Sequence, residues 1–63
     1  MEAWNNFIGK KVFVILKNKR SYSGVVEEVN DVGNGLIFLG LRDKFGQFLM
    51  FAVSEIEVIE EER

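Results

Sequence analysis

Three short segments of the chain are apolar at almost every position, and they determine most of its predicted secondary structure. These segments are residues 12–16, 36–41 and 48–53. A strand with one face in water would alternate apolar and polar residues, whereas these segments are apolar on both faces. We predict strands over residues 10–17, 36–41 and 48–53, each with both faces covered.

The segment at residues 20–30 differs, because a glycine lies in the middle of a run of strand-forming residues. A glycine such as Gly24 weakens a strand unless the strand must bend or let another backbone approach. A small barrel needs such a bend, because one long strand has to serve both sides of the closed sheet. We therefore predict a bent strand over residues 20–30, entered through a tight turn at residues 18–19.

Turn-forming residues separate the remaining elements. Residues 30–35 are almost all Asn, Asp and Gly, and they predict a loop. Residues 42–46 predict the next turn, with Gly46 at a positive φ. A short fifth strand then follows over residues 56–59. Residues 60–63 are expected to form a solvated acidic tail.

The beginning of the chain has apolar residues at helical spacing. Trp4, Phe7 and Ile8 would share one face of a helix, and Gly9 stands where a helix C-cap glycine is expected. We predict a short helix within residues 1–9, with Trp4 and Phe7 packed onto the barrel so that they close one end of it.

Five strands with short connections and a bent second strand define the fold class. We predict one all-β domain over residues 1–63, a small, strongly bent five-stranded barrel of the SH3-like or OB-like kind with a short N-terminal helix. Phe13, Ile15, Leu49 and Phe51 cannot all point into its interior beside their neighbours. Some of them therefore pack under the helix and others face another subunit, because exposed apolar edges invite pairing with a second chain.

The composition excludes several classes of function. The 63 residues include no Cys and no His, which rules out disulfides, thiolate zinc sites, imidazole ligands, a His base and a Cys nucleophile. No serine lies in a nucleophile-elbow pattern. The segment at 33–35 is too short for a phosphate-binding loop and precedes a strand. We expect no enzyme activity, cofactor, metal or small-molecule substrate. The longest apolar run is too short to span a bilayer and no secretory signal is present, so we expect a cytoplasmic protein without a membrane partner.

The charge is distributed unevenly along the chain. The net charge is −2, yet residues 1–20 hold five of the eight basic residues and one acid. This predicts a basic patch on an acidic body, with Lys17, Lys19 and Arg20 in a turn beside Tyr22. Basic side chains next to an aromatic ring suit single-stranded nucleic acid. The alternative is an ordinary solvated turn, with Tyr22 packed in the core.

The order of the elements resembles the Sm-like superfamily, which includes archaeal and eukaryotic Sm-like proteins and bacterial Hfq, over nearly the whole chain. The first motif of that superfamily runs from a basic turn into aromatic-x-Gly-x-aliphatic, then an apolar residue, an Asp-type position and an Asn. The residues in matching positions are Tyr22, Gly24, Val26, Val29, Asn30 and Asn34. Asn30 replaces the usual Asp, and Gly35 adds a residue.

The second motif of the superfamily, an Ile-Arg-Gly type segment between the fourth and fifth strands, is not present. Ala52, Val53 and Ser54 are instead similar to the Ala-Ile-Ser segment of Hfq, with Phe51 where Hfq has a His. The resemblance implies that the fourth strand of one subunit pairs with the fifth strand of the next. This pairing would close a homo-oligomeric ring, a hexamer or heptamer.

The resemblance also implies binding of single-stranded, U- or A-rich RNA by an RNA chaperone or RNA-processing scaffold. Superfamily RNA sites come from the loop after the second strand and the loop before the fifth, here Asn30, Asp31, Asn34 and Ser54. Asn side chains can read base edges, although Asn30 and Asn34 equally suit plain turns. The missing Arg-Gly pair, the acidic charge and the apolar strand faces favour an alternative, an oligomeric scaffold that binds protein without nucleic acid.

Overall fold

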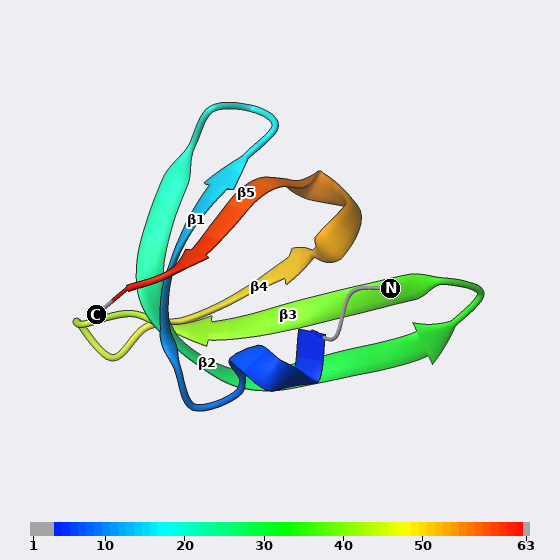
Figure 1. Ribbon diagram of the computed structural model, residues 1–63, viewed down its shortest axis with the longest axis horizontal. Coiled ribbons are helices and arrows are strands. Elements are labelled where there is room, and N and C mark those ends of the chain that lie inside the picture. Colours follow the sequence, from blue (N-terminus) through cyan, green and yellow to red (C-terminus); the bar gives the residue numbers. More distant parts are fainter. Residues whose placement is uncertain (1–3, 63) are drawn as a thin grey trace.

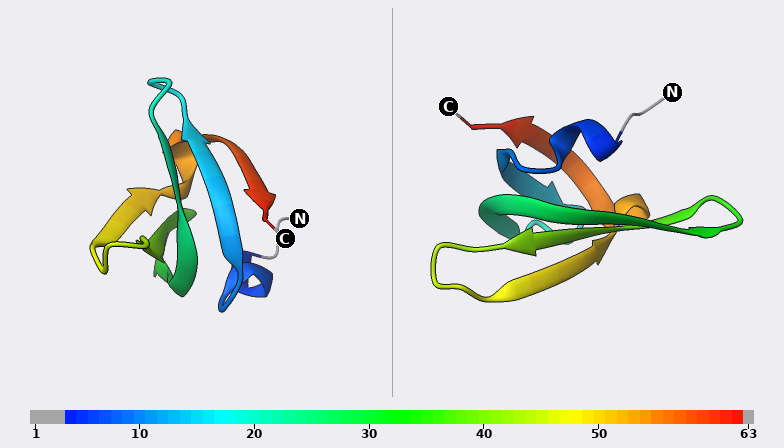
Figure 2. Two further views of the ribbon diagram at one scale, coloured as in Figure 1. Left: turned by 90° about the vertical axis from the view of Figure 1, so that its left-hand side faces the viewer. Right: turned by 90° about the horizontal axis from the view of Figure 1, so that it is seen from below.

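The computed structural model describes residues 4–62, which form a single antiparallel sheet of five strands (Figure 1). The strands lie in the order β4-β3-β2-β1-β5 across the sheet. Their bounds are β1 Lys11–Leu16, β2 Ser21–Gly33, β3 Leu36–Arg42, β4 Phe48–Ala52 and β5 Ile56–Glu61. The prediction of an all-β chain with five strands is confirmed. The sheet is strongly twisted, so that β1 and β5 lie across from β3 and β4 (Figures 1 and 2).

The N-terminal helix is shorter than predicted. A single 3-10 turn, η1, spans Trp4–Phe7, and residues 1–3 of the expected helix lie outside the described residues. Gly9 follows at a φ of 85°, and its N–H donates to the carbonyl of Val26 over 2.8 Å. Trp4 and Phe7 are half-buried against the core, with ring centroids 5.9 Å apart. Their predicted packing onto the sheet is therefore confirmed.

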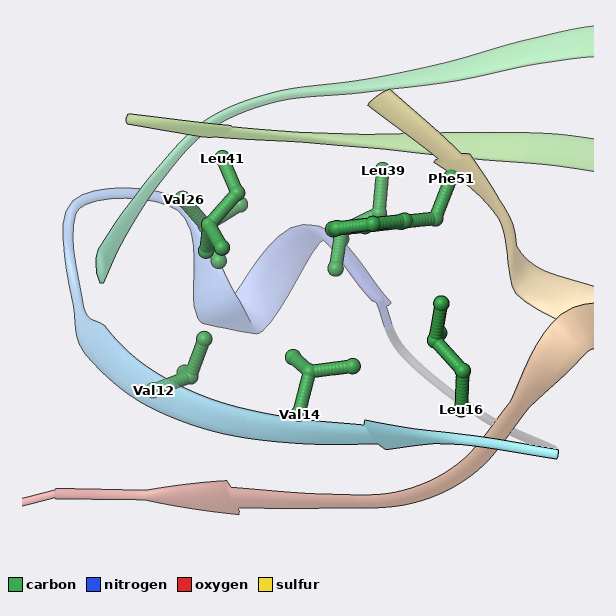
Figure 3. Packing of buried hydrophobic residues seen from close by; sticks show 7 residues of the cluster. All are labelled: Val12, Val14, Leu16, Val26, Leu39, Leu41 and Phe51. Carbon is green, nitrogen blue, oxygen red and sulfur yellow. The ribbon is translucent and has the colours of Figure 1, made fainter. Parts of the chain in front are cut away.

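The core lies inside the curl of the sheet. Figure 3 shows side chains of β1 pointing toward those of β2, β3 and β4. The buried residues are Val12, Val14, Leu16, Val26, Leu39, Leu41 and Phe51. Of the four residues that could not all point inward, Phe51 is buried in this core and Leu49 is half-buried against it, while Phe13 and Ile15 are half-buried on the other face of β1. The ring of Tyr22 packs tilted against that of Phe51, with 5.0 Å between centroids. Tyr22 thus belongs to the edge of the core.

The glycine of β2 permits a close approach between this strand and the backbone at the end of β3. A Cβ atom on Gly24 would lie 2.8 Å from the carbonyl carbon of Arg42 and 3.0 Å from the Cα of Asp43. These are backbone atoms at the end of β3, so they cannot move aside as a flexible side chain would. Of the two reasons predicted for this glycine, the close approach of another backbone is confirmed.

The prediction of a loop over residues 30–35 is wrong, because β2 continues to Gly33. Asn34 and Gly35 have φ values of 58° and 77° and form a two-residue turn directly into β3. Positive φ at both central residues is the requirement of a type I′ turn, whose twist suits adjoining strands. Asn30 and Asp31 are consequently strand residues, opposite Phe38 and Ile37. The hairpin extends beyond the rest of the sheet (Figure 1).

The end of the chain also contains more strand than predicted. A 3-10 turn, η2 (Val53–Glu55), separates β4 from β5, and β5 continues through Glu61. Glu60 and Glu61 lie opposite Phe13 and Val12 of β1, although their side chains are exposed. The acidic residues of the expected tail are therefore partly held in the sheet.

Candidate nucleic-acid and assembly surfaces

The basic turn between β1 and β2 has a defined backbone. The N–H of Lys19 donates to the carbonyl of Leu16 over 2.9 Å, and the N–H of Arg20 donates to Oδ1 of Asn18 over 3.0 Å. Lys19 has a φ of 74°, and the side chains of Lys17, Lys19 and Arg20 are all exposed. The turn therefore presents three cationic side chains to solvent from a hydrogen-bonded backbone.

The basic turn lies against η2, so the predicted basic site and the predicted site residue Ser54 are neighbours. The N–H of Lys17 donates to the carbonyl of Glu55 over 2.9 Å. An open pocket of about 280 Å³ lies between them, lined by Leu16, Lys17, Asn18, Ser54 and Glu55. Its size is near the lower end of the roughly 300–1,000 Å³ typical of small-molecule sites. The structure thus brings Lys17 and Ser54 together, with an ammonium, a hydroxyl, an amide and a carboxylate in reach.

Acidic residues moderate the charge of this surface. Nζ of Lys19 lies 3.6 Å from Oε1 of Glu57, with 79% of the lysine side chain exposed. Glu55 adds a second carboxylate at the pocket. An ion pair so open to water is weak and easily exchanged, so Lys19 remains available to a phosphate.

The other predicted site residues do not line this pocket. Asn30, Asp31 and Asn34 belong to the β2–β3 hairpin, and Oδ1 of Asp31 accepts a hydrogen bond from the N–H of Gly33 over 2.9 Å. Asn30 and Asp31 are neighbours on a strand, so their side chains point to opposite faces. Asn34 occupies the positive-φ position of the turn. The expected cluster of these three residues in one loop with Ser54 is therefore not formed within the chain.

A second surface feature, at the end of β3, was not predicted from the sequence. Nε and Nη2 of Arg42 donate to Oε2 and Oε1 of Glu27 over 3.2 and 3.1 Å, and Nη1 donates to the carbonyl of Gly46 over 2.9 Å. The guanidinium also lies over the ring of Phe48, 5.1 Å from its centroid. The hydrogen bonds to Glu27 raise the pKa of Arg42. Glu27 and Arg42 are distant in sequence, and only the β2–β3 pairing brings them together.

An open groove of about 550 Å³ lies beside this ion pair. Its lining residues are Lys11, Ser23, Gly24, Val25, Glu27, Arg42, Asp43 and Lys44. Carboxylates and ammonium groups occur together in it, and Oδ1 of Asp43 is already used by the N–H groups of Phe45 and Gln47. The groove includes none of the seven residues predicted as a site.

The two edges of the sheet form a third surface. Within residues 4–62, β4 pairs only with β3 and β5 pairs only with β1. Both edges expose apolar side chains, with Phe48, Met50 and Val58 exposed at 38%, 45% and 37%, and β5 also exposes three glutamates. Edge strands with exposed apolar side chains and free backbone hydrogen-bonding groups are templates for pairing with another chain.

No family model, curated protein or solved structure matches the chain. In the part of the chain from residue 4 to residue 62, no group of three or more acidic residues is placed to hold a metal ion. The helical turns of the same part are too short to cross a membrane.

Proposed function

We propose that this chain is an Sm-like protein that assembles into a homo-oligomeric ring and binds single-stranded RNA in the cytoplasm. The observation that carries the proposal is the strand order, which leaves β4 and β5 as the two free edges of one sheet. In the Sm-like superfamily these are the strands that join neighbouring subunits. The proposed role is that of an RNA chaperone or RNA-processing scaffold.

The physical chemistry of so small a chain supports assembly. A domain of about 60 residues buries only about 60% of its unfolded surface and is marginally stable alone. Joining β4 of one copy to β5 of the next satisfies the edge backbone groups and covers Met50 and Val58. A ring of six or seven copies leaves no edge free.

The RNA half of the proposal rests on the pocket between the basic turn and η2. Lys17, Lys19 and Arg20 supply positive charge for phosphates, and Ser54 supplies a hydroxyl for a base or ribose. Asn34, at the tip of the hairpin, is a further candidate for reading bases once copies are joined. The acidic body restricts binding to this patch and repels a duplex, so we expect single strands. The preference for U- or A-rich sequence is what the resemblance to the Sm-like superfamily implies.

A fluorescence anisotropy titration with short oligouridine and oligoadenosine RNAs tests this half. We expect binding that weakens with salt, and a further loss when Lys17→Gln and Lys19→Gln are combined. For single strands, the slope against salt should fall by about 0.7 for each phosphate contact removed. Lys10→Gln is the matched control, because Lys10 is also exposed and paired with a glutamate, Glu61, at 3.5 Å.

The competing function is a ring or scaffold that binds protein without nucleic acid. Glu55 and Glu57 beside the basic turn favour it, since they lower the potential at the pocket. An oligomer that shows no salt-sensitive RNA binding at micromolar protein would exclude RNA binding and favour this alternative.

A further inference from the structure

The turn between β3 and β4 holds a phenylalanine almost entirely in water. Phe45 is 83% exposed, the highest value among the large apolar residues exposed in the described part of the chain. The turn lies away from the basic turn at residues 17–20, as Figures 1 and 2 show. A ring so exposed adds little to the stability of the fold, because it buries almost no apolar area. It is therefore free to contact a ligand.

Hydrogen bonds order the backbone under this ring. Oδ1 of Asp43 accepts from the N–H groups of Phe45 and Gln47 over 2.9 and 2.8 Å. The N–H of Asp43 donates to the carbonyl of Gln47 over 2.9 Å. Nη1 of Arg42 donates to the carbonyl of Gly46 over 2.9 Å. The ring is displayed from an ordered turn, so that binding to it requires little further ordering of the backbone.

The turn itself carries no net charge. Nζ of Lys44 lies over the ring of Phe45, 5.3 Å from its centroid, and Asp43 is the acid of the same turn. One ammonium and one carboxylate so close together largely cancel for a charged ligand at a distance. The exposed ring, and not the charge, is therefore the feature of this turn that can hold a ligand.

The groove of about 550 Å³ beside the turn is also close to neutral. The turn lines it together with the ion pair of Arg42 and Glu27, whose charges cancel. Lys11 is its other charged residue, and the N–H of the acidic residue Glu62 donates to the carbonyl of Lys11 over 2.7 Å. Within residues 4–62, this groove consequently offers room and polar groups without a strong excess of either charge.

A single exposed ring among charged residues suits an unpaired nucleic-acid base. A base of any kind can stack on an aromatic side chain, and the stack needs one flat ring. The centre of a protein interface is instead depleted of charged residues, whereas Phe45 has Lys44 and Asp43 as its immediate neighbours. The hydroxyl of Ser23, on the lining of the groove, can bond to a ribose or phosphate beside the ring.

We propose that Phe45 stacks on an unpaired base of the single-stranded RNA, and that the groove beside it receives the adjoining ribose and phosphate. This inference rests on the RNA binding proposed above and adds a second contact, away from the basic turn. Because the turn and the groove are close to neutral, stacking holds the RNA here and the contact does not depend on salt. The contacts of the basic turn with phosphates do depend on salt.

Substitutions of Phe45 test the stacking. The probe is a labelled oligoadenosine RNA of about 20 nucleotides, longer than the roughly 4–16 nucleotides that a small barrel covers. In an anisotropy titration, Phe45→Ala and Phe45→Leu should each weaken binding roughly tenfold, and Phe45→Trp should retain it. Leucine is the matched control, because it keeps an apolar side chain and removes the flat ring. Val32→Ala, at another exposed apolar position, should leave the affinity unchanged.

The salt dependence of binding separates stacking from charge. Phe45→Ala should leave the slope of log affinity against log salt unchanged, whereas Lys17→Gln combined with Lys19→Gln should lower it. A slope that falls by about 0.7 in Phe45→Ala, as when a phosphate contact is lost, would overturn stacking as the source of the effect.

Tryptophan fluorescence gives a direct signal from the proposed contact. In the Phe45→Trp chain, a base stacked on the indole should quench its emission beyond any change seen in the unmodified chain, whose single tryptophan is Trp4. Val32→Trp places an indole at an exposed position of the hairpin and should show no added quenching. Equal quenching at both positions would overturn the placement of the base on Phe45.

The outcomes separate this inference from RNA binding itself. No RNA binding by the unmodified chain would overturn both proposals. Binding that is lost with Lys17→Gln and Lys19→Gln but unchanged in Phe45→Ala would overturn the stacking contact and leave the basic turn as the RNA site. Full affinity in Phe45→Leu would also overturn it, because an apolar side chain without a ring would then suffice. Circular dichroism checks that each variant is folded, as expected for substitutions at so exposed a position.

Discussion

Gly24 lies against the carbonyl group of Arg42, and no side chain fits between the two backbones. The first carbon of any side chain on Gly24 would be 2.8 Å from the carbonyl carbon of Arg42. The contact joins the first part of β2 to the end of β3, next to the paired residues Val25 and Arg42. It also lies at the groove that holds Arg42 and Glu27.

Replacing Gly24 by alanine should therefore destabilise the fold. Neither strand can yield without breaking ladder hydrogen bonds, so we expect a loss of about 1–3 kcal/mol in the free energy of unfolding, the usual range for overpacking. Urea denaturation followed by circular dichroism measures it. Ser23→Ala, at the exposed neighbouring position, is the control. Equal stability of the two variants would contradict the close approach.

The hairpin turn at Asn34 should distinguish residues by their tolerance of positive φ. Asn34→Val places a β-branched residue at a φ of 58°, and we expect a loss of about 1–2 kcal/mol. Asn34→Gly should keep the stability close to that of the unmodified chain, because glycine adopts this conformation without cost. Thermal unfolding of the two variants measures the difference. A harmless Asn34→Val would show that the turn does not hold the hairpin register.

The region around this turn shows which parts of the fold the sequence could predict and which it could not. The five strands and the reason for Gly24 were predictable, because both follow from local patterns of apolar residues and glycine. The residues at 30–35 were expected to form one loop, yet only Asn34 and Gly35 turn. Polar residues such as Asn30 and Asp31 give no local signal for a strand, and their partners lie across the hairpin.

The candidate sites likewise include residues that the sequence could predict and contacts that it could not. The basic turn was predictable from Lys17, Lys19 and Arg20, since they are close in sequence. Its contact with Ser54 depends on β5 lying beside β1, and the Arg42–Glu27 pair depends on the register of β2 with β3. Such contacts are set by the sheet as a whole, and no short segment of sequence determines them.

The ion pair of Arg42 and Glu27 should make no difference to the pH dependence of stability near neutrality. The folded-state pKa of Arg42 is raised by its hydrogen bonds to Glu27. Its contribution is therefore fully present below the pKa of an unfolded arginine and is lost only as the pH rises through the folded value. From about pH 7 to about pH 10, where arginine stays charged, Glu27→Gln should lower the melting temperature by a constant amount. A difference that vanishes within this range would contradict the assignment.

The buried side chain of Leu39 should carry more stability than the exposed apolar residues. It is fully buried where β3 crosses the core, so Leu39→Ala should cost about 2–5 kcal/mol through lost burial and the cavity left behind. Val32, which is 53% exposed on the hairpin, provides the control. Val32→Ala should change the free energy of unfolding by less than about 0.5 kcal/mol. Comparable losses in the two variants would place the core elsewhere.

A charge on the edge of β4 should abolish the proposed assembly while leaving the fold of each chain intact. Met50 is 45% exposed and points away from the core, so Met50→Lys adds a solvated ammonium without disturbing the buried residues. Lysine on an edge strand opposes pairing, because joining the strands would cover its charge. We expect a monomer by light scattering with an unchanged circular dichroism spectrum. Val32→Lys places the same charge on the hairpin, and it should leave the oligomer unaffected. If Val32→Lys dissociated the oligomer and Met50→Lys did not, copies would be joined through the hairpin, and the free edge of β4 would have no part in assembly.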